Sequence, residues 1–178
     1  RHNLSNALIA LAMAVEYGCP HQQLAKALAS YKGVKRRFTY QIKTDDLVFI
    51  DDYAHHPEEI NAVHQAVREM YPSKKVLAIF QPHLYTRTRD FIDDFAKSLS
   101  QFDEVILLDI YPARELPIDG VTSSWLLGKI NNENKQLVSR TDLLKVIHES
   151  EAQIILTIGA GDIGEEVKHI KKELSVAS

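Results

Sequence analysis

The segment richest in residues that could do chemistry follows an apolar run, Val76–Phe80, which predicts a strand. Residues 81–90 read Gln-Pro-His-Leu-Tyr-Thr-Arg-Thr-Arg-Asp, with no acid before the last position, and a helical pattern begins near Thr88. Ligands of open α/β sheets gather where strands end, and unpaired N–H groups at a helix start favour anions. Arg87 and Arg89 add charge suited to a carboxylate or phosphate. The alternative is an ordinary turn with solvated arginines and Thr88 as N-cap.

A second polar segment, residues 51–57, reads Asp-Asp-Tyr-Ala-His-His-Pro after another apolar run. Its acids could hold ribose hydroxyls or orient an arginine, and its histidines could donate to an anion or act as acid or base. A metal site made by His55, His56 and the carboxylates is less favoured, because adjacent histidines point apart and the spacing matches no metal motif. Either histidine could also be a turn residue that bonds the backbone. Other histidines are expected on helix surfaces or beside a cap: His64, His148, His169 and His21.

Residues 159–164 contain the pattern Gly-x-Gly-x-x-Gly after an expected strand, which is the form of a dinucleotide fingerprint. The context argues against NAD binding, because the pattern follows the last strand and no second βαβ half can come after it. We predict instead a tight turn that lets the backbone approach a helix or a ligand closely. The chain contains no Gly-x-x-x-x-Gly-Lys-Ser/Thr phosphate loop.

Three further segments carry polar residues that could line a site. Asn3 and Asn6 lie three residues apart in an expected helix, so their amides share one face and suit either capping or a ligand. Residues 33–38 read Gly-Val-Lys-Arg-Arg-Phe and are either a linker with solvated charge or an arginine-bearing loop between two modules. Residues 109–120 form a long loop of the kind that often lines sites, although its Arg114–Glu115 pair could equally be solvated.

Composition bounds the class of protein. A chain of 178 residues suits one domain with a fragment of another, and 45% apolar with 25% charged residues is typical of a soluble globular protein. The net charge of −3 gives no global positive field for nucleic acid or anionic lipid. There is no signal peptide and no apolar run of membrane-spanning length. The single Cys19 excludes an internal disulfide and fits a reducing cytosol, and the start at Arg1 without Met indicates a piece of something longer.

Apolar periodicity predicts the elements that position these segments. Two helices are expected first, over residues 3–17 and 20–30, then a hairpin over 38–43 and 47–50. Further strands are expected near 75–80, 104–109, 135–138 and 153–158. Further helices are expected near 57–70, 88–100, 122–131, 141–149 and 162–174, with Thr122 and Thr141 as N-caps. The predicted fold is α/β and Rossmann-like: a doubly wound, about six-stranded, mostly parallel sheet with one antiparallel edge strand and helices on both faces.

Several of these segments, in this order and at these distances, resemble the C-terminal part of the Mur ligases. The segments are His2-Asn3-Leu4-Ser5-Asn6, Gly33–Phe38, Asp51–Pro57, Phe80–His83 with Tyr85–Asp90, and Gly159–Asp162. The resemblance covers almost the whole chain. It implies three domains in the complete protein, of which residues 1–32 are the helical tail of the central ATPase domain and residues 33–178 the Rossmann-like C-terminal domain.

The resemblance also implies a reaction. Within the family, the pattern matches the ligases that use ATP to activate the carboxyl group of UDP-N-acetylmuramate as an acyl phosphate, which the amine of L-alanine then attacks. Mg²⁺ assists, with its ligands mainly in the absent central domain. The implied partners are these substrates and the missing N-terminal and central domains, with no nucleic acid and no membrane, in the bacterial cytoplasm. The alternatives are a same-fold ligase that attaches a recycled murein tripeptide, or a non-catalytic nucleotide- or anion-binding module.

By residue, the resemblance implies roles that composition and spacing do not assign. The implied ATP-binding residues are Asn3, Asn6, Arg37 and Asp52. The implied catalytic residues are Arg37, Asp52 and His55, and the substrate-binding residues are His55, His83, Thr86 and Arg87, with no metal ligand. One departure concerns Leu84, where many members carry a second basic residue. Without the phosphate-loop domain, the fragment alone is expected to be inactive.

Overall fold

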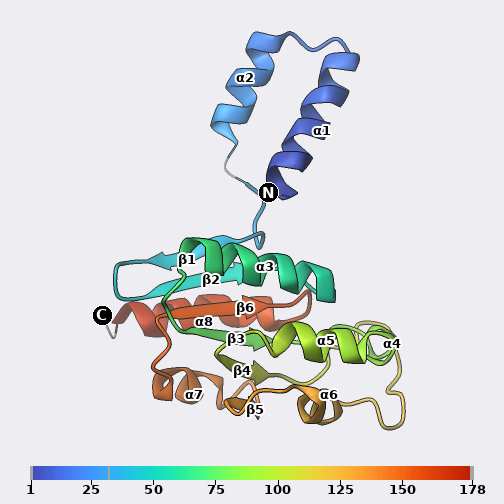
Figure 1. The fold of residues 1–178 in the computed structure, drawn as a ribbon, viewed down its shortest axis with the longest axis vertical. Helices are drawn as coiled ribbons and strands as arrows, with labels where there is room; N and C mark the ends of the chain where they lie inside the picture. Colours follow the sequence, from blue (N-terminus) through green and yellow to red (C-terminus); the bar gives the residue numbers. More distant parts are fainter. Residues whose placement is uncertain (1, 32, 177–178) are drawn as a thin grey trace. The chain divides into compact units, whose positions relative to one another are not determined.

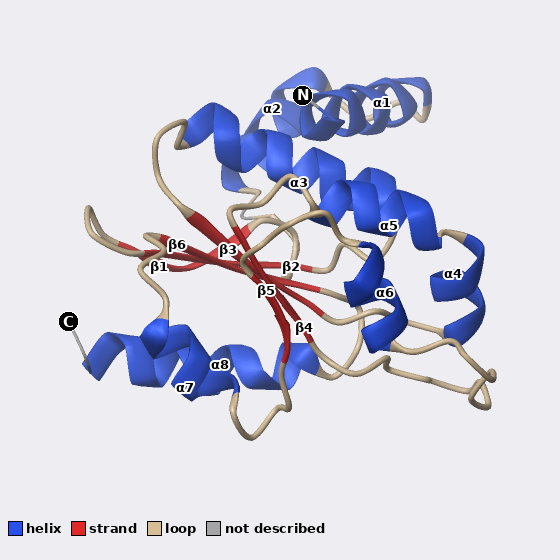
Figure 2. Cartoon of the chain, turned by 60° about the horizontal axis from the view of Figure 1, so that its bottom comes forward, coloured by secondary structure: helices blue, strands red, loops and turns tan. Residues whose placement is uncertain are grey.

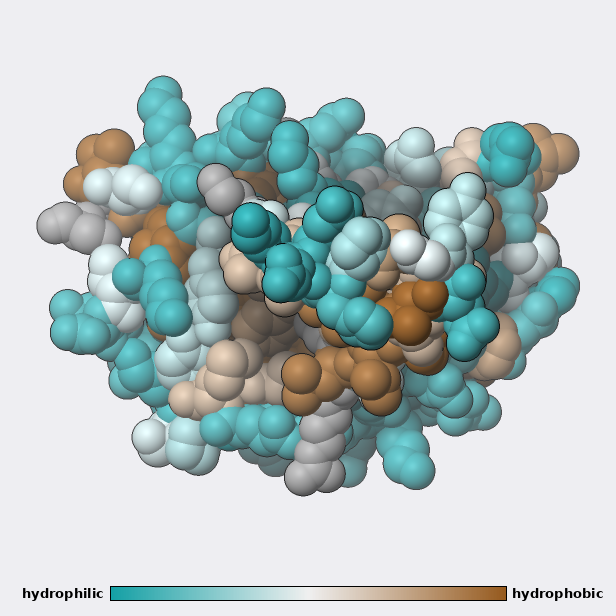
Figure 3. Space-filling view, turned by 90° about the horizontal axis from the view of Figure 1, so that it is seen from above, coloured by the Kyte–Doolittle hydropathy of each residue, from teal (hydrophilic) through white to brown (hydrophobic). Residues whose placement is uncertain are grey.

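The computed structural model describes residues 2–31 and 33–176, with side chains from Leu4 onward, and it divides into two compact units. The first unit ends at Val34 and holds α1 (His2–Glu16) and α2 (His21–Ser30). Gly18, with φ of 88°, ends α1 as predicted, and its N–H donates to the carbonyl of Val15 at 2.9 Å. Apolar side chains of α1 stay uncovered in this unit, and apolar residues are visible at the surface in Figure 3. No helix in the described residues is long and apolar enough to cross a bilayer.

The second unit begins at Lys35 and is built on a six-stranded sheet in the order β1-β2-β6-β3-β4-β5 (Figure 1). Its strands are β1 (Thr39–Lys43), β2 (Val48–Asp52), β3 (Val76–Phe80), β4 (Glu104–Leu107), β5 (Lys135–Leu137) and β6 (Ile154–Ile158). Edge strand β1 pairs antiparallel with β2, and the other pairs are parallel. The predicted fold class is confirmed.

Helices cover both faces of this sheet (Figure 2). One face carries α3 (Pro57–Met70), α4 (Tyr85–Asp90), α5 (Ile92–Leu99) and α6 (Ser123–Lys129), and the other carries α7 (Leu143–Glu149) and α8 (Ile163–Val176). Because side chains alternate along a strand, Phe80 joins the core on the first face and Ile79 the core on the second. The central strands β3 and β6 are buried throughout, which explains why every residue in them except Thr157 is apolar.

Three expectations about helix starts and N-caps are wrong. The helix expected over 88–100 is two helices, which break at Phe91, where φ is −117°. Thr88 is not an N-cap: it is buried inside α4, and its hydroxyl donates to the carbonyl of Leu84 at 2.8 Å. Thr141 does not cap α7 either, because Asp142 takes the N-cap position. Thr122 caps α6 as predicted by accepting from the N–H of Trp125 at 3.0 Å.

The expectation that His64 lies on a helix surface is also wrong. Its ring packs edge-on against Phe102, with ring centroids 4.9 Å apart. Its Nε2 is buried and has no hydrogen-bond partner within the described part of the chain. Burial lowers the pKa of His64, and the charge of Arg68 lowers it further. Protonation of this side chain therefore opposes folding.

Acid is expected to weaken the fold through His64. The unfolded residue takes up its proton near pH 6.5 and the folded residue only at lower pH, so stability present above 6.5 falls as the pH drops through that window. His64→Leu is expected to flatten this dependence, measured as the free energy of unfolding in urea at about pH 7.5 and about pH 5.5. The exposed His148→Leu is the matched control. The same pH slope in His64→Leu and wild type would contradict the assignment.

Candidate functional site

Loops that follow three parallel strands meet at one edge of the sheet. Strand β6 lies between β2 and β3, and Asp52 and Phe80 both lie opposite Ile158, so the three strands end level. The loops after them lie side by side at the carboxyl edge (Figure 1): residues 53–56, 81–84 and 159–162. This is the edge at which open α/β sheets bind ligands.

Two of these loops bring His55 and His83 together, with ring centroids 6.1 Å apart. Nη1 of Arg87 lies 3.3 Å from Nδ1 of His83. Because a guanidinium has only donors, Nδ1 of His83 accepts and its ring proton sits on Nε2. Nδ1 of His55 lies 2.9 Å from the carbonyl oxygen of Tyr53, which only accepts, so in the neutral ring Nδ1 carries the proton. When both rings are neutral, the pair offers one N–H donor, on Nε2 of His83, and one lone pair, on Nε2 of His55.

Arg87 gives this cluster a permanent positive charge. Burial lowers the pKa of His83, and the nearby Arg87 and His55 lower it further, while Glu115 acts in the opposite direction. His83 is therefore neutral at physiological pH and keeps its Nε2–H as a donor. An anion at this place would meet the guanidinium of Arg87 and a neutral imidazole.

Thr86 is engaged by the loop that follows β4. The carboxylate of Glu115 accepts the backbone N–H of Thr86 at 2.9 Å and also its hydroxyl. These hydrogen bonds hold the pKa of Glu115 below its usual range. Of the two readings left open for Arg114–Glu115, the solvated pair is not the one observed, because Glu115 ties its loop to the start of α4.

Leu84, between His83 and α4, has an unusual backbone conformation, with φ of 74° and ψ of 134°. Residues with a side chain rarely adopt a positive φ. The N–H of Leu84 donates to the carbonyl of Tyr111 at 2.9 Å, and its own carbonyl accepts from the N–H of Thr88 at 3.1 Å. These bonds hold a strained residue at the candidate site, as is common where geometry serves binding.

Arg37 contacts α3, the helix that follows His55. Its side chain is 58% exposed, and its Nη1 lies 3.9 Å from a carboxylate oxygen of Glu59. The other oxygen of Glu59 accepts the backbone N–H of His55 at 2.9 Å. One carboxylate therefore links Arg37 and His55, and the guanidinium keeps most of its donors free for an anion.

Asp52 is buried beside this segment, and both of its oxygens are used by the backbone. It accepts the N–H of Phe38 at 2.6 Å and the N–H of Ala54 at 2.8 Å. Burial raises the pKa of Asp52, while these bonds and the charge of Arg37 lower it. Asp52 thus fixes the backbone of Phe38, the residue after Arg37, and its predicted roles of holding ribose or orienting Arg37 stay predictions.

Arg36 is the important residue that the sequence did not single out. Its Nε donates to the buried Asp51 at 3.1 Å, its Nη2 donates to the carbonyl of Gly159 at 2.7 Å, and its guanidinium lies 5.1 Å from the ring centroid of Tyr53. The available signal was Asp51 at the end of a buried strand, because a buried carboxylate needs a cation. Two adjacent acids and two adjacent arginines do not reveal which pairs with which.

The remaining predicted residues belong to the first unit. The side chain of Asn3 lies outside the described residues, and Asn6 is exposed on α1. Neither is placed relative to the histidine cluster. For metals, the described residues contain no group of three or more His, Cys, Asp or Glu that could hold an ion.

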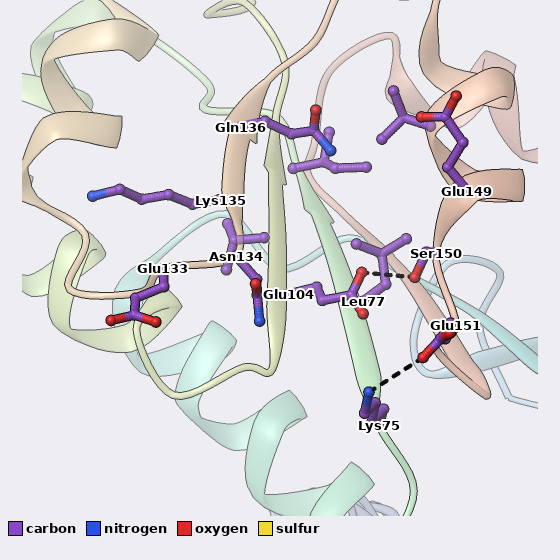
Figure 4. A pocket seen from close by; sticks show the side chains of 13 residues that line it. Lys75, Leu77, Glu104, Glu133, Asn134, Lys135, Gln136, Glu149, Ser150 and Glu151 are labelled. Atoms are coloured by element: carbon purple, nitrogen blue, oxygen red, sulfur yellow. Dashed lines mark hydrogen bonds and ion pairs between the residues drawn. The ribbon is translucent and has the colours of Figure 1, made fainter.

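A hollow of about 460 Å³ lies at the opposite, amino-terminal edge of the sheet (Figure 4). Four of its polar side chains pair with one another: Ser150 donates to Glu104 at 2.7 Å, and Lys75 lies 3.7 Å from Glu151. None of the predicted site residues lines it. The chemistry-bearing residues instead gather at the carboxyl edge.

Comparison with known sequences gives consistent matches. A family model described as "Mur ligase, glutamate ligase domain" matches residues 36–163. The chain is 67% identical over 174 residues to the UDP-N-acetylmuramate–L-alanine ligase of Flavobacterium psychrophilum, and 51% identical over 175 residues to the protein of that name from Porphyromonas gingivalis. Each match covers 98% of this chain but only 39% and 38% of those relatives, so the chain spans about two fifths of their length.

Solved structures agree on the fold. The UDP-N-acetylmuramate-alanine ligase of Thermotoga maritima superposes with a TM-score of 0.77 at 30% identity, over 99% of this chain and 38% of that one. A murein peptide ligase from Psychrobacter arcticus superposes with a TM-score of 0.71 at 24% identity, over 97% of this chain and 37% of that one. The second likeness supports the fold alone.

Proposed function

The chain belongs to the Mur ligase family, and from this premise we propose that it is the C-terminal, amino-acid-binding part of an ATP-dependent ligase. The ligase joins L-alanine to the carboxyl group of UDP-N-acetylmuramate, in the synthesis of peptidoglycan precursors in the cytoplasm. The identity of 67% to a relative with that name supports this substrate pair. Residues 1–32 are then the tail of the central ATPase domain and residues 33–178 the C-terminal domain, and the division of the structure after Val34 supports that boundary.

The observation that carries the proposal is that His83 presents a hydrogen-bond donor and His55 presents an acceptor at the same place. An amino acid presents a carboxylate and an amine on one carbon. The Nε2–H of His83 and the guanidinium of Arg87 suit the carboxylate, while the free lone pair of His55 suits the amine. Thr86 lines the same place, with Glu115 as its partner in this structure. No second basic residue is needed at Leu84 for this arrangement.

The reaction follows from these positions. The γ-phosphoryl group of ATP passes to the muramate carboxylate and ADP leaves. The amine of alanine then attacks the carbonyl carbon of the acyl phosphate, the new C–N bond forms as the C–O bond to phosphate breaks, and the amine loses a proton, which His55 accepts. Fixing the carboxylate of alanine at His83 and Arg87 holds the amine in line, which lowers the entropic barrier.

ATP would be held partly by this chain. Arg37 is exposed and reaches the phosphates, Asp52 orients the segment that carries it, and Asn3 and Asn6 lie near the base in the complete protein. Mg²⁺ would assist the phosphoryl transfer, with its ligands mainly in the central domain.

The proposed function predicts a strict substrate requirement. The full-length protein is expected to form UDP-N-acetylmuramoyl-alanine, ADP and phosphate only when ATP, UDP-N-acetylmuramate and L-alanine are all present, followed by coupled ADP release and mass spectrometry of the product. The 178-residue chain alone is expected to turn over no ATP, because it has no phosphate loop. Product formed with a murein tripeptide but not with alanine would overturn the substrate assignment in favour of the tripeptide ligase. If neither alanine nor the murein tripeptide gives a product, the enzymatic function is overturned in favour of a non-catalytic nucleotide- or anion-binding module.

A further inference from the structure

The glycine-rich turn after β6 has a use that the proposed function does not explain. A Cβ atom on Gly161 would lie 2.5 Å from Oε1 of Gln81 and 2.7 Å from both Cβ and Cγ of Tyr111. A Cβ atom on Gly159, where φ is 148°, would lie 2.9 Å from the carbonyl oxygen of Gln81. Real Cβ atoms do not approach other atoms this closely, so the predicted tight turn is confirmed. The absence of side chains at Gly159 and Gly161 leaves space that Gln81 and Tyr111 occupy.

Gln81 cannot yield to a side chain at position 161. Its Oε1 accepts the N–H of Ile163 at 2.9 Å, and its Nε2 donates to Asp162 at 2.6 Å. Gln81 is also buried, and its backbone N–H donates to the carbonyl of Ile158 at 3.0 Å. The space beside Gly161 is therefore bounded by one fixed side chain and by Tyr111.

Tyr111 connects this turn to the histidine cluster. Its ring stacks on the imidazole of His83, with ring centroids 5.6 Å apart and an interplanar angle of 26°. Its backbone N–H donates to the carbonyl of Pro82 at 2.8 Å, and its carbonyl accepts the N–H of Leu84 at 2.9 Å. The main chain of Tyr111 thus holds the residues on both sides of His83, and its side chain covers the ring between them.

The same loop is tied down a second time. Four residues beyond Tyr111, Glu115 accepts both the N–H and the hydroxyl of Thr86 at the start of α4. Arg87, which bonds His83, is the next residue along α4. The loop after β4 therefore holds in place the segment that carries His83 and Arg87, the two side chains to which the carboxylate of alanine is assigned.

We propose that Tyr111 is a positioning residue, which sets the plane of the His83 imidazole for the incoming amino acid, and that Gly161 preserves the space that the Tyr111 ring requires. The identity of that amino acid rests on the proposed function. The contact between the rings of Tyr111 and His83 is observed and does not depend on it. Tyr111 itself touches no reacting atom in this scheme. It acts through His83.

The test compares Tyr111→Leu, which removes the ring, with Tyr111→Phe, which keeps it, in the full-length protein. Tyr111→Leu is expected to raise the KM for L-alanine about fivefold and to leave the KM for UDP-N-acetylmuramate unchanged, whereas Tyr111→Phe stays close to wild type. Gly161→Ala presses on the same ring and should raise the KM for alanine in the same direction. Gly128→Ala is its control, because a Cβ atom there meets nothing within 4 Å. An alanine KM in Tyr111→Leu equal to that of wild type would overturn the proposal.

A second readout separates this inference from the function on which it rests. The pKa of His83 is measured by NMR titration of the labelled full-length protein, with the signal assigned through His83→Gln. The charged or titratable neighbours Arg87, His55 and Glu115 are retained in both variants. Uncovering the ring in Tyr111→Leu relieves burial and should raise this pKa towards 6.5, while Tyr111→Phe should not. If wild type forms no product with alanine, the proposed function fails, and an unchanged pKa in Tyr111→Leu would refute the positioning role by itself.

Discussion

Replacement of Arg87 by alanine should raise the KM for L-alanine about tenfold or more in the full-length protein, because a hydrogen bond to a charged group is typically worth about 1.5–3 kcal/mol. The KM for UDP-N-acetylmuramate should stay unchanged. Arg87 lies 3.3 Å from His83 and supplies the positive charge of the cluster, since burial keeps His83 neutral. Arg87→Lys keeps the charge but loses the planar fork, so it should recover only part of the affinity.

The matched control for this prediction is Arg89→Ala. Arg89 lies on the same short helix, its side chain is 50% exposed, and its Nε pairs with Asp90 at 2.8 Å. Steady-state kinetics at saturating ATP and UDP-N-acetylmuramate would compare the two variants. The carboxylate assignment fails if both arginine variants bind alanine as wild type does, and it moves to Arg89 if that variant alone is impaired.

The second large effect concerns stability. Arg36→Met should lower the free energy of unfolding by about 3 kcal/mol, at the lower end of what breaking a buried ion pair costs, because the arginine is partly exposed. Asp51 would remain as a carboxylate with 2% side-chain exposure and no cation. The carbonyl of Gly159 would lose its donor as well. Urea denaturation of the 178-residue chain measures the change.

Arg37→Met provides the neighbouring control, because that side chain is 58% exposed and its contact with Glu59 is long, at 3.9 Å. Its effect on stability should stay within about 0.5 kcal/mol. Gly164→Ala probes the same contact from the other side, since a Cβ atom there would lie 2.6 Å from Nη1 of Arg36. Equal destabilisation by Arg36→Met and Arg37→Met would show that the pair with Asp51 is not the stabilising contact.

The strands and the fold class could be predicted because a strand that is buried on both faces of a sheet consists almost entirely of apolar residues. The run at 76–80 is apolar throughout, the run at 154–158 is apolar except for Thr157, and the structure buries every residue of both strands. The break at Phe91 could not be predicted, because no glycine or proline marks it. The partial burial of His64 was equally hidden, since a single polar residue within an amphipathic helix looks solvent-facing until its neighbours are known.

For the site, the sequence revealed which loops matter but not how their residues pair. His55 and His83 stand out beside strand ends, and the structure does bring them together. The pairing of Arg36 with Asp51, and that of Glu115 with Thr86, join segments far apart in the chain. Side-chain type and local spacing carry no information about such partners, and only the packed fold selects between two adjacent arginines.

The place of β6 in the sheet also fixes when this site can form. His55 and His83 follow β2 and β3, yet β6, the strand that joins β2 to β3, comes after β4 and β5 in the sequence. During synthesis, a nascent chain that stops before residue 154 has no central strand to hold the two histidine loops level. The binding edge is therefore completed only after β6 has been synthesised, and a premature stop codon ahead of β6 would remove the strand that holds the two histidine loops level, even though every residue proposed to touch substrate is present.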